Sequence, residues 1–246
     1  MREFVEKHLL EGQNPEAIAG RLRNQKQLPR ISKDSIYRFI SSEHGRRIEY
    51  ERNKIRKRTK TRKRKAKIER LQDRDFIEKR PKSASNRRRI GDCEGDFVVS
   101  GKQSKAILLV IVDRMSRYCW IRQILEPSCA EIERQLLDIQ RQFPEMITLT
   151  LDNDILFQKH RELERSLRIK IYFTEPYSSW QKGTVENINK HIRKYIPKGS
   201  DISKYSTTEI QSVQERLNNR FMKVLDYKTP REVLKNTVES GVRISP

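Results

Sequence analysis

The pattern of hydrophobic and polar positions divides the chain into three parts. Apolar residues recur at helical spacing through residues 1–41, become sparse over residues 46–90, and return in strand-like and helical runs from residue 91 onward. This pattern predicts a small all-α domain at residues 1–45, a linker at residues 46–90, and a larger α/β domain at residues 91–246.

The first part is predicted to form three short helices. The run REFVEKHLL is amphipathic, a second helix begins at Asn14 and Pro15, and Ser32 caps a third helix with the sequence KDSIYRFIS. Two short helices joined by a turn are typical of a helix-turn-helix domain, although any three-helix bundle would give the same pattern. In the first interpretation the last helix contacts DNA through Lys33, Ser35, Tyr37 and Arg38.

Strand-type and helical runs alternate in the third part. The strand-type runs CEGDFVV, KAILLVIVD and RYCWIRQIL come first, and ITLTLD and KIYFTE follow between helical patterns. KAILLVIVD is nearly all apolar, as expected of a central strand that is buried on both faces. The order of the runs predicts a mixed five-stranded sheet with helices on both faces, near residues 129–143, 156–168, 184–195 and 206–220.

Positive charge is concentrated in the linker. The chain holds 54 Lys and Arg against 33 Asp and Glu, a formal net charge of +21, and residues 46–90 alone carry 21 basic and 6 acidic residues. Such a block is typical of a solvated arm that binds a polyanion, and it lacks the apolar face that a membrane-surface helix needs. We expect Arg58, Arg62 and Arg64 to contact the backbone of a nucleic acid.

The cysteines and histidines give no metal or disulfide pattern. Cys93, Cys119 and Cys129 are an odd number without zinc-type spacing, and the four histidines are scattered. The sequence shows no signal-peptide pattern, and no apolar run approaches the length of a membrane span. We therefore expect reduced thiols in a soluble cytoplasmic protein.

Three carboxylates stand in local contexts that suit metal ligands. Asp96 lies inside a predicted strand, Asp152 ends another, and Glu186 opens the amphipathic pattern ENINKHIRKY. A carboxylate in mid-strand is unfavourable unless it is paired or bound to metal, and Mg²⁺ prefers such hard oxygen ligands. The set therefore suggests divalent-metal phosphoryl transfer. The alternative is ordinary strand-end and surface carboxylates, with an i,i+4 salt bridge between Glu186 and Lys190.

Other acidic residues have simpler interpretations. Asp113 ends a predicted strand and begins the turn DRMSR, so a turn role is expected there. Asp92 is expected to fall before the first strand, and both it and Glu94 are alternatives to Asp96 as ligands. The DND sequence at 152–154 does not begin a calcium loop, because the twelfth position is Leu163. The sequence has no P-loop and gives no indication of ATP dependence.

Several of these segments match one family over most of the chain. They include NPEAIAGRL, ISKDSIYRFI, IGDCEGD, VDRMSRY, LTLDN, EPYSSWQKGTVENINKHIRKYIPKGSD and YKTPREVL. Together they resemble the insertion-sequence transposases of the "IS thirty" family, which have a retroviral-integrase-like catalytic domain. The most specific part is the long match around Glu186, which thirty-three residues separate from Asp152.

The resemblance implies an RNase H-like catalytic domain and a DNA transposase that cuts and joins transposon ends. It implies that Asp96, Asp152 and Glu186 are the catalytic residues and bind two Mg²⁺ or Mn²⁺ ions, and that Lys190 and Arg193 hold DNA beside them. The implied partners are double-stranded DNA, as transposon terminal repeats and target, and further copies of the chain in a homo-oligomer. The implied location is the bacterial cytoplasm, in association with the nucleoid.

Two departures from the family pattern keep alternatives open. Cys93 stands where the family usually has Trp, and Asp154 where it usually has Gly, beside the predicted ligand Asp152. A catalytically decayed DNA-binding protein, either a repressor or a domesticated transposase, is therefore the first alternative. An RNA-directed nuclease on the same scaffold is the second, and the predicted helix-turn-helix argues against it.

Overall fold

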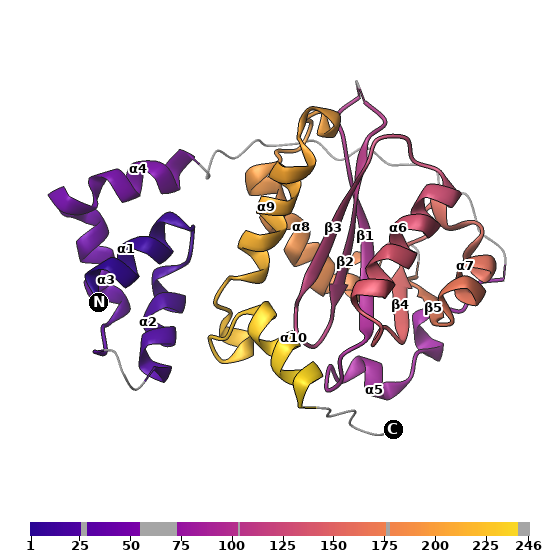
Figure 1. Ribbon diagram of the computed structural model, residues 1–246, viewed down its shortest axis with the longest axis horizontal. Coiled ribbons are helices and arrows are strands. Elements are labelled where there is room, and N and C mark those ends of the chain that lie inside the picture. Colours follow the sequence, from indigo (N-terminus) through magenta and orange to yellow (C-terminus); the bar gives the residue numbers. More distant parts are fainter. Residues whose placement is uncertain (26–28, 55–72, 103, 176–177, 241–246) are drawn as a thin grey trace.

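Five strands form one mixed sheet in the larger part of the molecule (Figure 1). The computed structural model describes residues 1–25, 29–54, 73–102, 104–175 and 178–240. The sheet order is β3-β2-β1-β4-β5, in which β1, β2 and β3 are antiparallel and β4 and β5 run parallel to β1. The predicted mixed five-stranded sheet is confirmed. Its strands are β1 (Asp92–Val99), β2 (Ile107–Asp113), β3 (Cys119–Ile124), β4 (Thr148–Leu151) and β5 (Lys170–Phe173).

Helices cover both faces of this sheet (Figure 1). One hydrophobic core joins the sheet to α6 and α7, and a second joins its other face to α8 and α9. β2 lies between the two cores and every one of its residues is buried, which explains its nearly apolar sequence. The bounds of these helices are α6 (Cys129–Gln142), α7 (His160–Leu167), α8 (Gly183–Tyr195) and α9 (Thr207–Asn218), with α10 (Pro230–Glu239) beside α9.

The first strand begins one residue earlier than expected. Asp92 was predicted to precede it, but the residue pairs with Thr148 at the start of β4 and is fully buried. Its carboxylate accepts hydrogen bonds from the Thr148 hydroxyl at 2.7 Å and from the Arg89 guanidinium at 2.8 and 3.1 Å. Because both carboxylate oxygens have partners, Asp92 can be buried inside the sheet.

Among the residues that the structure describes, four α-helices form the N-terminal unit. The predicted caps are confirmed, since the side chains of Asn14 and Ser32 each accept a backbone N–H at the start of α2 and α3. The fourth helix lies in the range predicted as linker. It forms because Ile48 is buried in the hydrophobic core of this unit, so that packing overcomes an otherwise highly charged sequence. The helices are α1 (Arg2–Leu10), α2 (Pro15–Asn24), α3 (Lys33–Ser41) and α4 (Arg46–Lys54).

Shorter helical segments complete the described structure. The predicted linker range also contains η2 and α5, and the backbone N–H of Phe173 in β5 donates to Asp75 O at 2.8 Å, which attaches this range to the sheet edge. These segments are η1 (Glu43–Gly45), η2 (Ile77–Lys79), α5 (Lys82–Ser85), η3 (Ile155–Phe157), η4 (Ser179–Lys182), η5 (Ile202–Lys204) and η6 (Lys223–Leu225).

The N-terminal unit packs on the segment between α9 and α10. Phe221 is buried there, with its ring stacked 4.9 Å from the His8 ring and the Arg21 guanidinium 5.0 Å above it. Arg21 also forms a two-pronged ion pair with Glu232 at the start of α10. An apolar ring and an ion pair thus bind the two parts of the chain together.

Two further contacts explain small and polar residues in this interface. Gln13 is buried, donates to Asn219 O at 2.8 Å and accepts from the Phe221 N–H at 3.1 Å. Gly20 lies in the middle of α2 because a Cβ atom there would be 2.2 Å from a ring carbon of Tyr227. The absence of a side chain at Gly20 lets α2 approach this segment closely.

None of the helices in the described ranges is long and apolar enough to cross a membrane.

The interface makes a prediction about stability. Phe221→Ala removes a buried ring and should lower the free energy of unfolding by about 3 kcal/mol. Val224→Ala, three residues further on but 63% exposed, should change it by less than about 0.5 kcal/mol. Urea denaturation of both variants measures the difference, and equal small effects would contradict the packing described.

Candidate active site

Asp96 and Asp152 come together where β1 and β4 run side by side. These strands are parallel, and Glu94 is paired with Thr150. Asp96 lies two residues beyond Glu94, and Asp152 lies two residues beyond Thr150. The two aspartates therefore occupy equivalent positions along the two neighbouring segments. Side chains two residues apart share a face of a strand, which places both aspartates toward the side covered by α8.

A buried ammonium group bridges these two carboxylates. Lys182 Nζ lies 3.1 Å from Asp96 Oδ1 and 3.6 Å from Asp152 Oδ2, and it donates to Gly95 O at 3.1 Å. Lys182, the last residue of η4, is only 5% exposed. The aspartates therefore hold a single positive charge between them.

The remaining oxygens of the two aspartates differ. Asp96 Oδ2 accepts a hydrogen bond from Asn189 Nδ2 of α8 at 2.6 Å. Asp152 Oδ1 is buried and has no hydrogen-bond partner. Burial raises the pKa of the Asp152 carboxyl above its usual value; the Lys182 ammonium lowers it, and the negative charges of Asp96 and Asp154 raise it further. An unpartnered buried carboxylate oxygen is unfavourable unless a cation or donor reaches it.

Glu186 lies in the first turn of α8 and faces Lys190. Their side chains form the i,i+4 salt bridge that the sequence offered as the alternative interpretation, at 3.0 Å, and the Glu186 side chain is 46% exposed. Within the described ranges, no group of three His, Cys, Asp or Glu residues is arranged to hold a metal ion. The structure thus brings Asp96 and Asp152 together and leaves Glu186 paired with Lys190.

Glu94 fastens the helix that carries Glu186. Its Oε2 accepts the backbone N–H groups of Thr184 and Val185 at 2.9 and 3.0 Å, and its Oε1 accepts from Arg114 Nε at 2.9 Å. Glu94 is fully buried, and a carboxylate at a helix N-terminus is favoured by the helix dipole. Because both of its oxygens are used in this way, Glu94 holds α8 against β1 and is not free to act as a metal ligand.

Three arginines lie around the buried Glu94 carboxylate, and the sequence pattern did not predict their part in the site. Arg114 also donates to Ala84 O, and Arg117 donates to the Thr184 hydroxyl at 2.9 Å. Arg80 donates to the Thr150 hydroxyl at 3.1 Å, and burial together with the charge of Arg114 lowers its pKa to about 10. Their only sequence signals were RP at residues 80–81 and the motif VDRMSRY.

The other acidic residues near the site have structural roles. Asp113 accepts from the backbone N–H groups of Gly91 and Ser116 at 2.8 and 2.7 Å, so the expected turn role is observed. Burial raises the pKa of Asp113, and the hydrogen bonds from Ser116 oppose that effect. Asp154 caps η3 by accepting the Leu156 N–H at 2.9 Å, and this contact fixes the turn that follows Asp152.

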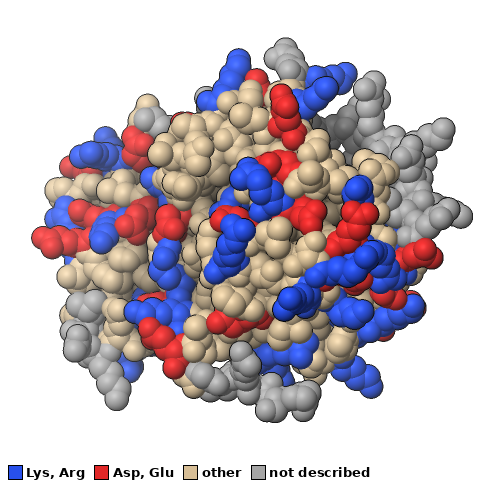
Figure 2. Space-filling model, turned by 45° about the vertical axis from the view of Figure 1, so that its right-hand side comes forward, with Lys and Arg blue, Asp and Glu red and all other residues tan. Residues whose placement is uncertain are grey.

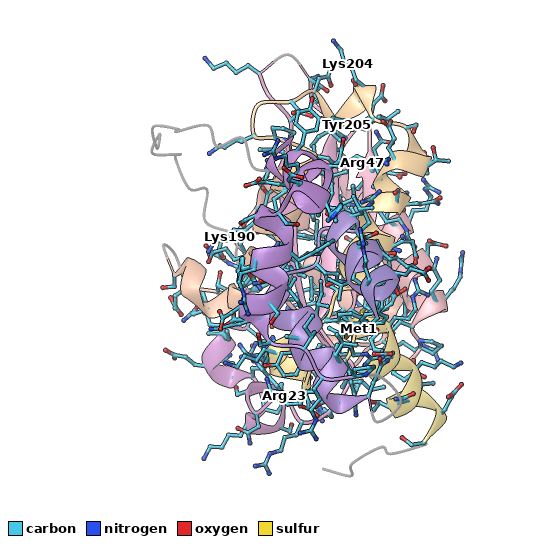
Figure 3. All side chains as sticks on the ribbon, turned by 90° about the vertical axis from the view of Figure 1, so that its left-hand side faces the viewer. Met1, Arg23, Arg47, Lys190, Lys204 and Tyr205 are labelled. Carbon is cyan, nitrogen blue, oxygen red and sulfur yellow. The ribbon has the colours of Figure 1, made fainter. Side chains whose placement is uncertain are left out.

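The predicted DNA-binding residues occupy three places. Arg193 donates to Val99 O at 2.9 Å and to Pro197 O at 3.2 Å. Lys190 belongs to α8, has a side chain that is 70% exposed, and is labelled at the left of Figure 3. On α3, Lys33, Tyr37 and Arg38 are exposed, and Ser35 is half-buried. The Lys33 ammonium lies 3.4 Å from the Glu16 carboxylate. The Ser35 hydroxyl is hydrogen-bonded to the Ser32 hydroxyl at 2.9 Å. Arg58, Arg62 and Arg64 lie outside the described residues.

The donor set fits a hard divalent cation. Two carboxylates already share one buried positive charge, and one of their oxygens is buried without a partner. Mg²⁺ and Mn²⁺ take such oxygen ligands, and Asp96 and Asp152 are the described residues placed to hold one.

Comparison with known proteins identifies relatives over the whole chain. Residues 86–179 match a family model described as the integrase core domain, a range that includes Asp96 and Asp152. The transposase for insertion sequence element IS4351 of Bacteroides fragilis is 35% identical over 245 residues, covering 98% of this chain and 74% of that protein. Transposase InsI for element IS30C of Escherichia coli K12 is 34% identical, covering all of this chain and 66% of that protein.

A solved structure is also similar. The catalytic core domain of BIV integrase aligns with a TM-score of 0.47 and 19% identity, over 61% of this chain and 97% of that one.

The sheet topology, the flanking helices and the core-domain match define an RNase H-like enzyme domain of the transposase and integrase class. Within that class, the proteins that are similar over nearly the full length of this chain are insertion-sequence transposases. The chain belongs to the IS30, or "IS thirty", family of transposases, as the resemblance implied. This membership favours a transposase over the alternative of a decayed DNA-binding protein.

The anchor at Glu94 predicts different effects for two neighbouring carboxylates. Glu94→Gln leaves the buried Arg114 uncompensated and places an amide against the start of α8, so unfolding should require about 3–5 kcal/mol less. Glu186→Gln removes only an exposed pair and should change stability by less than about 0.5 kcal/mol. Guanidinium denaturation of both variants tests this, and a Glu94→Gln protein as stable as the wild type would refute the anchoring role.

Proposed function

We propose that this chain cuts transposon-end DNA and joins it to target DNA, using two divalent metal ions held by Asp96, Asp152 and Glu186. The supporting observation is the pair of aspartates around one cation, with an unpartnered Asp152 oxygen beside it. When bound, Mg²⁺ or Mn²⁺ would activate the attacking oxygen and stabilise the leaving oxygen. No protein nucleophile is required.

The chain's own residues hold the two aspartates in place for this reaction. Asp96 lies within β1 and is bonded to Asn189, and Asp152 lies directly after β4, whose end is fixed by pairing with β5. Asp96 belongs to a strand and Asp152 directly follows one, so little backbone freedom is lost at either residue when a substrate binds.

Glu186 completes the proposed site by a side-chain rotation. It lies one turn before Asn189 on α8, and Asn189 contacts Asp96, so this face of the helix is already next to the aspartates. Turning Glu186 away from Lys190 would bring its carboxylate toward them. The same movement would free the Lys190 ammonium for a DNA phosphate.

The proposed partner is double-stranded DNA, as terminal repeats and target. The exposed residues of α3 would bind the terminal repeat, while Lys190, Arg193 and the basic range 46–90 would bind backbone phosphates. On the face shown in Figure 2, Lys and Arg occur in several groups with Asp and Glu among them. Separate basic groups suit contacts with several DNA segments. We further propose that the chain acts as a homo-oligomer on paired ends.

A strand-cleavage assay tests this function. The substrate is a labelled duplex that carries the element's terminal repeat, and nicked and joined products are measured with Mg²⁺ or Mn²⁺. Glu186→Gln should lower product formation by about a thousandfold, since ligand loss removes several kcal/mol of transition-state stabilisation. Asp96→Asn and Asp152→Asn should behave in the same way.

The control for this assay is Glu162→Gln. Glu162 pairs with Lys159 in an exposed i,i+3 salt bridge at the start of α7, which packs on the face of the sheet opposite α8, and its replacement should leave activity unchanged. If the wild-type protein binds the duplex tightly but forms no product, the proposed enzymatic activity is wrong and the protein only binds DNA.

A further inference from the structure

Lys182 is unusual among the lysines of this protein. In the part of the chain that the structure describes, it is the only lysine that is buried. Burying an ammonium group is unfavourable unless oxygen atoms replace its water shell. Asp96, Asp152 and the Gly95 carbonyl supply those oxygens at 3.1, 3.6 and 3.1 Å. The ammonium therefore lies where the proposed metal site needs positive charge.

A divalent ion and this ammonium would compete for the same carboxylates. Two unit positive charges 4 Å apart repel by about 4 kcal/mol at an effective dielectric constant near 20, and a divalent ion doubles that value. The two carboxylates can neutralise two positive charges, and a bound Mg²⁺ ion would by itself supply both. Lys182 would therefore leave its position when a metal ion binds between Asp96 and Asp152.

The backbone at Lys182 limits how this can happen. The next residues, Gly183 and Thr184, begin α8, and Glu94 holds the Thr184 and Val185 N–H groups against β1. The helix start is thus fixed, and the movement falls to the flexible lysine side chain. Rotating outward, its ammonium would leave the two carboxylates and move toward the place where the proposed function puts the DNA phosphate.

We propose that Lys182 is an internal counter-cation that a metal ion must displace, and that its displacement couples metal binding to DNA binding. This inference rests on the proposed function. A phosphate oxygen stabilises the displaced ammonium, so DNA favours the conformation that accepts metal. Coupling between two ligands is reciprocal, so metal must also strengthen the binding of DNA. Lys182 is in this sense a positioning residue for the metal and a contact for the phosphodiester.

The first test is Mn²⁺ binding without DNA, measured from the electron paramagnetic resonance signal of the free ion. Lys182→Gln removes the competing charge and should bind Mn²⁺ about tenfold more tightly, equivalent to about 1.4 kcal/mol. Lys182→Arg keeps a positive charge and should bind as weakly as the wild type. Lys159→Gln, which replaces an exposed lysine paired with Glu162, should have no effect.

The second test is the affinity for a labelled terminal-repeat duplex, measured by fluorescence anisotropy with and without Mn²⁺ at matched ionic strength. The wild type should bind the duplex several-fold more tightly with Mn²⁺, and Lys182→Gln should lose most of that difference. A thermal melt in EDTA verifies that each variant is folded.

The outcomes separate this inference from the function on which it depends. If Lys182→Gln binds Mn²⁺ no more tightly than the wild type, the counter-cation role is wrong, while the cleavage proposal stands. If Asp96→Asn leaves the Mn²⁺ affinity of the wild type unchanged, no metal binds at the aspartates. That result overturns both proposals.

Discussion

The buried carboxylate of Glu94 ties the start of α8 to the middle of β1, and the positions of the other site residues follow from that contact. It accepts two N–H groups of the helix and the guanidinium of Arg114. Lys182 directly precedes the anchored turn, and Glu186 and Asn189 follow it along the helix. A single buried acid thus sets the distance between the strand that carries Asp96 and the helix that carries Glu186.

Two acids on one face of β1 have separate tasks because their surroundings differ. Glu94 is completely enclosed and has donors for both oxygens, so it is structural. Asp96 lies two residues further along, is partly exposed, and shares an ammonium with Asp152. The strand therefore changes from a buried anchor to a charged, accessible site within two residues, where a substrate can approach the sheet.

Local patterns in the sequence predicted the strands and the helix caps, and they gave the pairing of Glu186 with Lys190 as the alternative to a metal ligand, because each depends on residues close together in the chain. Asp96 and Asp152 were singled out as candidate ligands from their places in and at the end of predicted strands, and the structure brings these two side chains together. The roles of Glu94 and Lys182 were not predicted, because their partners lie about ninety residues away in sequence. The same reason applies to α4, which burial of Ile48 stabilises, and to Phe221, whose ring packs on the N-terminal unit.

A crystal structure with Mn²⁺ and a terminal-repeat duplex, in which anomalous scattering locates the metal, tests the proposed metal site directly. We predict a Mn²⁺ ion bound by Asp96 and Asp152, with Lys182 displaced toward a phosphate and Glu186 turned away from Lys190. A structure in which the duplex is bound, Lys182 still bridges the aspartates and no anomalous signal lies beside them would contradict it.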